Sequence, residues 1–175
     1  MSLKVRGMKK DIARALYCSS LMEKKVATAY EKLSEKVDDL VVKKLLLCIS
    51  IDSLKHFILL NALGESVMKL DVDEELCKAQ MGQAWNSIDK MAEEETSSGS
   101  SMKEDIPALI KKMNSLESFM GEEHFTALQL KLTNMMAEEA GIEFDEIKKM
   151  IEWIIVDEDR HEKIVQMIYR RIQGT

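Results

Sequence analysis

Residues 154–161 read Ile154-Ile155-Val156-Asp157-Glu158-Asp159-Arg160-His161, and they put a carboxylate and an imidazole on the apolar face of a predicted helix. Residues three apart lie on one side of an α-helix, so Glu158 and His161 point the same way. A carboxylate in a core is costly unless it is paired or binds a metal. The predicted buried face of this helix is Ile147, Ile151, Ile154, Glu158, His161, Val165 and Ile168.

Length and composition predict one all-α domain over residues 1–175. The chain is long enough for one well-cored domain and is rich in Leu, Ile, Met, Lys and Glu, with one proline and 5% aromatic residues. A net charge of −6 without a basic, aromatic-interleaved cluster argues against nucleic acid as a partner. We also expect no membrane span, since no apolar run reaches roughly 18 residues, and no signal peptide.

The three cysteines form no Cys-x-x-Cys pair. Cys18, Cys48 and Cys77 are odd in number, and this pattern predicts free thiols in a reducing environment. We therefore expect a cytoplasmic location.

Apolar spacing predicts two helical hairpins joined by a crossover. The segments are a hairpin over 8–64, a crossover over 65–104 that contains an extra helix and a Ser-Gly run, and a hairpin over 105–172. The four long helices are expected over 8–37, 40–63, 105–139 and 144–172. Asp39 is the expected N-cap of the second helix and Gly64 its C-terminal cap.

The other three long helices also have predicted buried faces. On the first helix these residues are Ile12, Leu16, Ser20, Glu23, Ala27, Tyr30, Leu33 and Val37. On the second they are Val42, Leu46, Ile49, Ser53, His56, Leu60 and Leu63. On the third they are Leu109, Met113, Leu116, Met120, Glu123, Ala127, Leu130 and Asn134.

The second and fourth helices form an internal repeat. Residues 43–56 align with 148–161 without a gap, which pairs Asp52 with Asp157, Lys55 with Arg160, and His56 with His161. We expect the aspartates to pair with Lys55, Arg160 or a neighbouring helix. Two histidines in equivalent positions, with Glu23 and Glu123 on the facing helices, favour a metal site over two ordinary core histidines. His124, the third histidine, is expected at the surface.

This arrangement resembles the ferritin-like superfamily, especially its rubrerythrin-like branch. That family places a Glu on each of two helices and a Glu-x-x-His on each of the other two, all pointing inward. Asp157-Glu158-Asp159-Arg160-His161 carries the resemblance most specifically, followed by Glu23 with Tyr30 seven residues on. The resemblance implies a ferritin-like antiparallel four-helix bundle with one long crossover between helices 2 and 3. The rubredoxin-type module of that branch is absent.

By position, the resemblance implies five metal ligands. Glu23 and His56 would be terminal ligands of one ion, Glu123 and His161 of the other, and Glu158 would bridge both. Ser53 stands where the family has its second bridging glutamate, so one or two ions remain open. Iron is the implied metal, with manganese and zinc as alternatives. Glu122 remains an alternative to Glu123.

Three functions stay open at this point. The first is an oxidoreductase of the di-iron type that acts on O₂ or peroxide, and the second is a metal-binding bundle without turnover. The third is a ferritin-like bundle that has lost metal chemistry and acts as a structural or interaction module. A homodimer is expected, with Trp85, Ile88 and Met91 of the crossover as its contact surface, unless these residues cap their own bundle.

Overall fold

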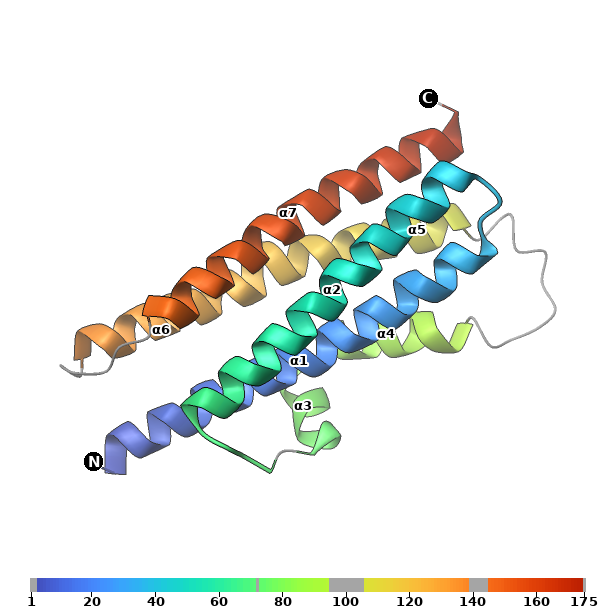
Figure 1. The fold of residues 1–175 in the computed structure, drawn as a ribbon. Coiled ribbons are helices and arrows are strands. Elements are labelled where there is room, and N and C mark those ends of the chain that lie inside the picture. The colour runs from blue at the N-terminus through green and yellow to red at the C-terminus, as the bar shows by residue number, and fades with distance from the viewer. Residues whose placement is uncertain (1–2, 72, 95–105, 139–144, 175) are drawn as a thin grey trace.

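The protein is all-helical in the part of the chain that the structure describes. The computed structural model describes residues 3–71, 73–94, 106–138 and 145–174. Its elements are α1 (Leu3–Lys36), α2 (Leu40–Val67), α3 (Glu74–Met81), α4 (Gln83–Glu94), α5 (Ile106–Ser118), the π-helix η1 (Phe119–Phe125), α6 (Thr126–Glu138) and α7 (Asp145–Gln173) (Figure 1). These ranges contain no strand, which confirms the all-α prediction.

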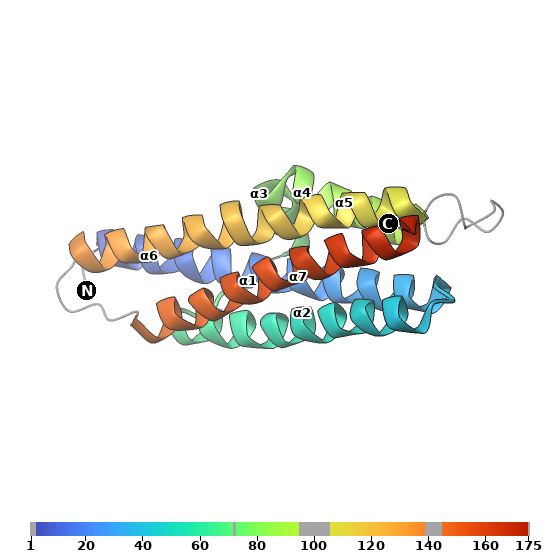
Figure 2. The ribbon, with the colours of Figure 1, turned by 90° about the horizontal axis from the view of Figure 1, so that it is seen from above.

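Four long helical segments lie side by side: α1, α2, the continuous α5–η1–α6, and α7 (Figures 1 and 2). α1 and α2 form one hairpin and pack closely. The connection from α2 to α5 returns along the length of the bundle and carries α3 and α4, which pack against α1. The Ser-Gly run of the predicted crossover lies outside the described residues.

The structure confirms the predicted N-cap of α2 but not its predicted C-terminal cap. Asp39 is its N-cap, because the carboxylate accepts hydrogen bonds from the backbone N–H groups of Val41 and Val42 at 2.9 and 3.1 Å. Gly64, predicted as the C-terminal cap, instead lies inside the helix, which continues to Val67. A Cβ at Gly64 would lie 3.3 Å from the carbonyl oxygen of Ala13, so the glycine permits the close approach of α1.

The predicted buried faces of α1, α2 and α7 are confirmed at every position. The third long helix differs. Its predicted face holds for Met113, Leu116 and Met120, but from the last residue of η1 onward the buried residues are Phe125, Leu128 and Leu132. A π turn adds a residue to the helical repeat and rotates everything that follows it. Leu130, predicted to be buried, is therefore 60% exposed.

The crossover is fixed to α1 by a disulfide. Cys18 and Cys77 are bonded to each other, so the prediction of free thiols was wrong for both, and Cys48 is free and exposed. Trp85 and Ile88 of α4 are fully buried in the core of their own bundle. They pack α4 against α1 along the side of the bundle and are not available as a contact surface for a second copy.

α2 has an unusually apolar outer side. By length and composition alone it is the one helix of the described chain that could cross a membrane, with a mean hydropathy of 1.5 in its most apolar window. In the structure it packs against α1 and α7, and it buries Ser53 and His56. Its outward residues Ile51, Leu54 and Ile58 are nevertheless about half exposed or more, at 65%, 46% and 61%.

Candidate metal centre

Five titratable side chains from four helical segments meet in the middle of the bundle. They are Glu23 from α1, His56 from α2, Glu117 from α5, and Glu158 and His161 from α7, and each is at most 2% exposed. Four of them are ligands predicted from the sequence. For the fifth predicted ligand, Glu123, the backbone lies in η1 but the side chain is outside the described residues, as is that of Glu122.

Glu117 is the residue that the sequence analysis missed. It lies four residues after Met113 and three before Met120, both of which were predicted to be buried, so helical spacing alone placed it inward. Glu117 lies before η1, which begins at Phe119, so its spacing from Met113 and Met120 was a signal already present in the sequence.

The five side chains form two overlapping groups that could each hold a metal ion. One group is Glu23, His56 and Glu158, and the other is Glu117, Glu158 and His161, with the ligand atoms of each group within 4.8 Å of one another. His56 Nδ1 lies 3.0 Å from Glu158 Oε1 and 3.6 Å from Glu23 Oε2. His161 Nδ1 lies 3.3 Å from Glu117 Oε2 and 3.7 Å from Glu158 Oε1. Glu158 is thus shared by both groups.

The two repeats exchange aspartates to hold the histidines. His56 Nε2 lies 3.1 Å from Asp157 Oδ2, and His161 Nε2 lies 3.4 Å from Asp52 Oδ2. Each imidazole can therefore donate its Nε2 proton to an aspartate of the other repeat while its Nδ1 faces the glutamates. Metal-binding histidines commonly have such a carboxylate on the second nitrogen, because it fixes the tautomer and the ring orientation.

Two cations hold these aspartates in turn. Lys55 Nζ lies 2.9 Å from Asp52 and 2.7 Å from Asp157, and an Arg160 Nη atom lies 2.7 and 2.9 Å from the same two residues. This confirms the expected pairing. Because Lys55 and Arg160 are about half exposed, each ion pair contributes little to stability. Their effect is to fix the two aspartates against the imidazoles.

The electrostatics of the centre favour protonated histidines and one ionised glutamate in the metal-free protein. Burial lowers the pKa values of His56 and His161, but the glutamates outweigh it and raise these values to about 10 and 11. Burial also opposes ionisation of Glu158, yet contacts with the two imidazoles hold its pKa at about 2. Burial and the charge of Glu158 raise the pKa values of Glu23 and Glu117. Protons therefore occupy the positions that cations would take.

Several buried polar atoms of the centre make no well-aligned hydrogen bond among the described residues, although some of them lie close together as ion pairs. They are Glu23 Oε1, Tyr30 Oη, Ser53 Oγ, His56 Nδ1, both oxygens of Glu117, Glu158 Oε1 and His161 Nδ1. Buried polar groups are normally satisfied, so such a cluster points to a bound group that would satisfy them. A set of carboxylate oxygens and imidazole nitrogens fits a divalent metal such as iron, manganese or zinc.

Ser53 and Tyr30 lie beside the ligands. Ser53 occupies the place in α2 that Glu158 occupies in α7, and its side chain is fully buried. Burial and the carboxylate of Glu117 raise the pKa of Tyr30 well above its usual value, so its hydroxyl keeps a proton.

His124 was predicted to be a surface residue, but it is partly buried and contacts α1. Its Nε2 is 2.6 Å from Ser19 Oγ, which joins η1 to α1, and burial lowers its pKa to about 4. His124 is thus a contact between η1 and α1 outside both ligand groups.

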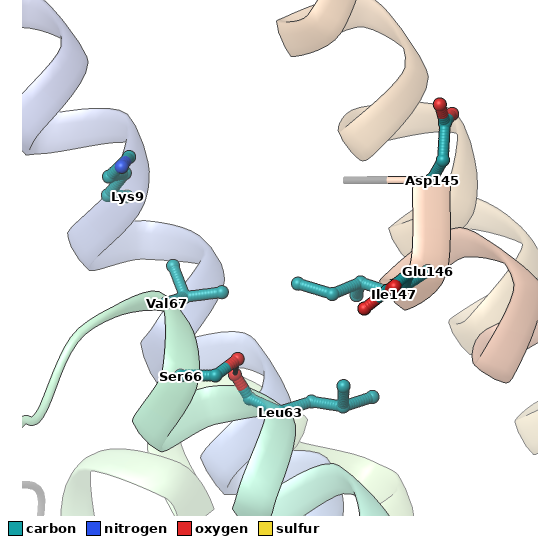
Figure 3. Close-up of a pocket in the computed structure, with 7 residues that line it drawn as sticks. All are labelled: Lys9, Leu63, Ser66, Val67, Asp145, Glu146 and Ile147. Carbon is teal, nitrogen blue, oxygen red and sulfur yellow. Dashed lines mark hydrogen bonds between the residues drawn. The ribbon is translucent and has the colours of Figure 1, made fainter. Parts of the chain in front are cut away.

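A cavity of about 440 Å³ lies elsewhere, between α1, the end of α2 and the start of α7 (Figure 3). Leu63, Val67 and Ile147 give it apolar walls, and Lys9 and Glu146 supply charge. It shares no residue with the two ligand groups, so it has no direct part in the chemistry of the centre.

Comparison of the chain with protein-family models, with curated proteins and with solved structures found no match in any of the three.

Proposed function

We propose that this chain is a ferritin-like, metal-binding carboxylate protein with an incomplete two-metal centre. In this proposal the long helices form a ferritin-like antiparallel four-helix bundle with one crossover, and the metal is iron. The observation that supports it best is the position of Glu158. Its carboxylate belongs to both buried groups, and each group has its own histidine and its own second glutamate.

The residues of the chain would share the work as follows. Glu23 and His56 would hold one ion, Glu117 and His161 the other, and Glu158 both. Asp157 and Asp52 would keep the Nδ1 atoms of the imidazoles directed inward. Iron in such a site supplies the electrons for reduction of O₂ or peroxide. The buried Tyr30 hydroxyl, with its proton retained, is the group of the chain best placed beside Glu117 to donate a hydrogen bond there.

Metal binding is tested by anaerobic titration with Fe²⁺ while the melting temperature is recorded. A ligand at 100 times its Kd stabilises the folded state by about 2.7 kcal/mol, which corresponds to a rise of roughly 5–11 °C for a domain of this size. A melting temperature unchanged by Fe²⁺ and by Mn²⁺ would overturn the proposal. Turnover is tested by comparing O₂ and peroxide consumption by the loaded protein with that of His161→Ala, and equal rates would exclude chemistry at this centre.

The alternative is a bundle that has lost metal chemistry and serves as a structural or interaction module. Ser53 favours it, because a serine cannot bridge two cations as a carboxylate does. The same titration separates the alternatives, since a relic would contain no tightly bound metal after purification and would gain no stability from added metal.

We further propose that the protein is a homodimer joined through the outer faces of α2 and α7. Eight large apolar residues there are 46–67% exposed: Leu40, Val41, Ile51, Leu54, Ile58, Trp153, Val156 and Met167. Since each leaves on the order of 100 Å² of apolar surface in water, the face offers roughly the 800 Å² that one partner contributes to a standard interface. Light scattering should give a dimer for the wild type and for Leu130→Glu, which lies on α6, but a monomer for Ile51→Glu. A monomeric wild type would refute this dimer.

A further inference from the structure

A second cavity leads from the surface to the candidate metal centre. It measures about 250 Å³ and lies between α7 and the junctions of α5 and α6 with η1. Its lining residues are Glu117, Ser118, Thr126, Ile155, Glu158, Asp159 and Glu162. Two of these, Glu117 and Glu158, are buried ligands with carboxylate oxygens that have no hydrogen-bond partner. The cavity therefore reaches the side chains of two ligand residues, whose carboxylate oxygens are themselves buried.

The outer part of this cavity is acidic. The Asp159 side chain is 62% exposed, and Glu162 is partly exposed. Asp159 pairs with the exposed Lys163, and Glu162 accepts a hydrogen bond from Gln166 at 3.0 Å, so these partners in the described part of the chain are exposed residues of the same helix. Four acidic residues thus line one cavity between the surface and the centre.

The corresponding face of the other hairpin has no acidic residue at the equivalent positions. In the repeat, Ser50, Leu54 and Phe57 of α2 take the places of Ile155, Asp159 and Glu162 of α7. The Ser50 hydroxyl donates a hydrogen bond to the carbonyl oxygen of Ala27 at 2.8 Å, which ties α2 to α1. Lys24 lies over the ring of Phe57 at 5.4 Å. Two apolar residues, Leu54 and Phe57, thus stand where α7 presents its two acids.

The π-helix accounts for the difference in packing. Ser118 and Thr126, which line the cavity, are the residues immediately before and after η1. A π turn widens the helix and breaks its regular packing against a neighbour, and such turns occur frequently at functional sites. α1, the partner of α2, is a regular α-helix throughout.

We propose that divalent cations enter the centre through this acidic cavity, where Asp159 and Glu162 capture the ion and Glu158 and Glu117 receive it. This inference rests on the proposed metal function. Carboxylates at the mouth of a cleft raise the local concentration of a cation and its rate of association, and salt weakens the effect. Asp159 and Glu162 would act on the rate of uptake without being ligands in the loaded state.

The test measures uptake of Co²⁺ by stopped-flow absorbance and its stoichiometry by equilibrium titration. The double variant Asp159→Asn with Glu162→Gln should bind the same number of ions but take them up about tenfold more slowly in low salt, and 0.5 M NaCl should remove most of the difference. The control is Glu31→Gln with Glu35→Gln, which removes two exposed carboxylates from α1 and should leave the rate unchanged. Ser118→Phe, which fills the cavity without a change in charge, should also slow uptake.

Each outcome bears on a different claim. If both cavity variants load as fast as the α1 control while the stoichiometry is unchanged, the entry route is wrong and the metal function stands. If the wild type binds no Co²⁺, Mn²⁺ or Fe²⁺, the proposed function fails and the entry route fails with it.

Discussion

Replacement of Ser53 by glutamate would supply the carboxylate that the centre lacks. In the metal-free protein the new side chain would stand near Glu23 and Glu158, in a place that is fully buried. It must therefore stay protonated at neutral pH. Keeping a glutamate of ordinary pKa about 4.3 protonated at pH 7 costs about 3–4 kcal/mol, so the metal-free variant should melt well below the wild type.

Metal should reverse this effect. Two divalent cations bring four positive charges, whereas Glu23, Glu117 and Glu158 bring three negative ones. One further negative charge about 4 Å from a divalent cation contributes about 8 kcal/mol at an effective dielectric constant of 20. Ionisation of the buried glutamate offsets about 4 kcal/mol of this, which leaves a net gain of about 4 kcal/mol. The second equivalent of metal should therefore bind up to about 10³-fold more tightly in Ser53→Glu.

Isothermal titration with Mn²⁺ measures both binding steps, and thermal melting with and without Mn²⁺ measures the stability. Ser53→Gln is the matched control, because it has nearly the same shape without the charge. It should bind the second equivalent no more tightly than the wild type does. If Ser53→Glu and Ser53→Gln bind the second equivalent equally, Ser53 does not face the metals and the reasoning fails.

Three further predictions concern the groups around the centre. Asp157→Asn should weaken metal binding about 10- to 100-fold, because it alters the group that holds His56 Nε2 at 3.1 Å; an unchanged Mn²⁺ affinity would contradict this role. The metal-free protein should lose stability to urea as the pH rises from 6.5 towards 10, because the fold raises the pKa values of His56 and His161 and so binds their protons more tightly than the unfolded chain does; stability that rises over this range would refute the raised values. Gly64→Val should cost about 1–3 kcal/mol in urea denaturation, because its Cβ would lie 3.3 Å from the backbone of Ala13, and a neutral result would show that α1 can move aside.

The spacing of apolar residues predicted much of the fold, because α1, α2 and α7 keep one α-helical period from end to end. The buried residues of α7 are those predicted from the sequence, including Glu158 and His161. The buried residues in the second half of the third long helix were not predicted, because a π turn depends on packing and leaves no clear mark in the apolar pattern. The Cys18–Cys77 bond also escaped, because the two residues meet only when the crossover folds back on α1.

The centre was predictable to the extent that it depends on the repeat. Glu23, His56, Glu158 and His161 were named from their positions, and the structure brings them together. Glu117 was missed although it precedes η1, because the carboxylate of this helix was expected further along the chain, at Glu123 or Glu122. The exchange of aspartates between the repeats could not be foreseen, since it depends on where α2 and α7 cross.

The two repeats, α2 and α7, are alike in the residues at the centre of the bundle and differ in those at its edge. The residues that α2 and α7 share are those that hold the imidazoles: a histidine, an aspartate four residues before it, and a cation beside it. The residues that differ, Ser53 against Glu158, Leu54 against Asp159 and Phe57 against Glu162, all make the α7 side more acidic. Orientation of the histidines requires both aspartates, because each holds the histidine of the other repeat. Access from water requires only one open side, and a second acidic opening would expose more of the centre without adding a ligand. The two hairpins thus share the residues that orient the histidines and differ in the residues at the cavity.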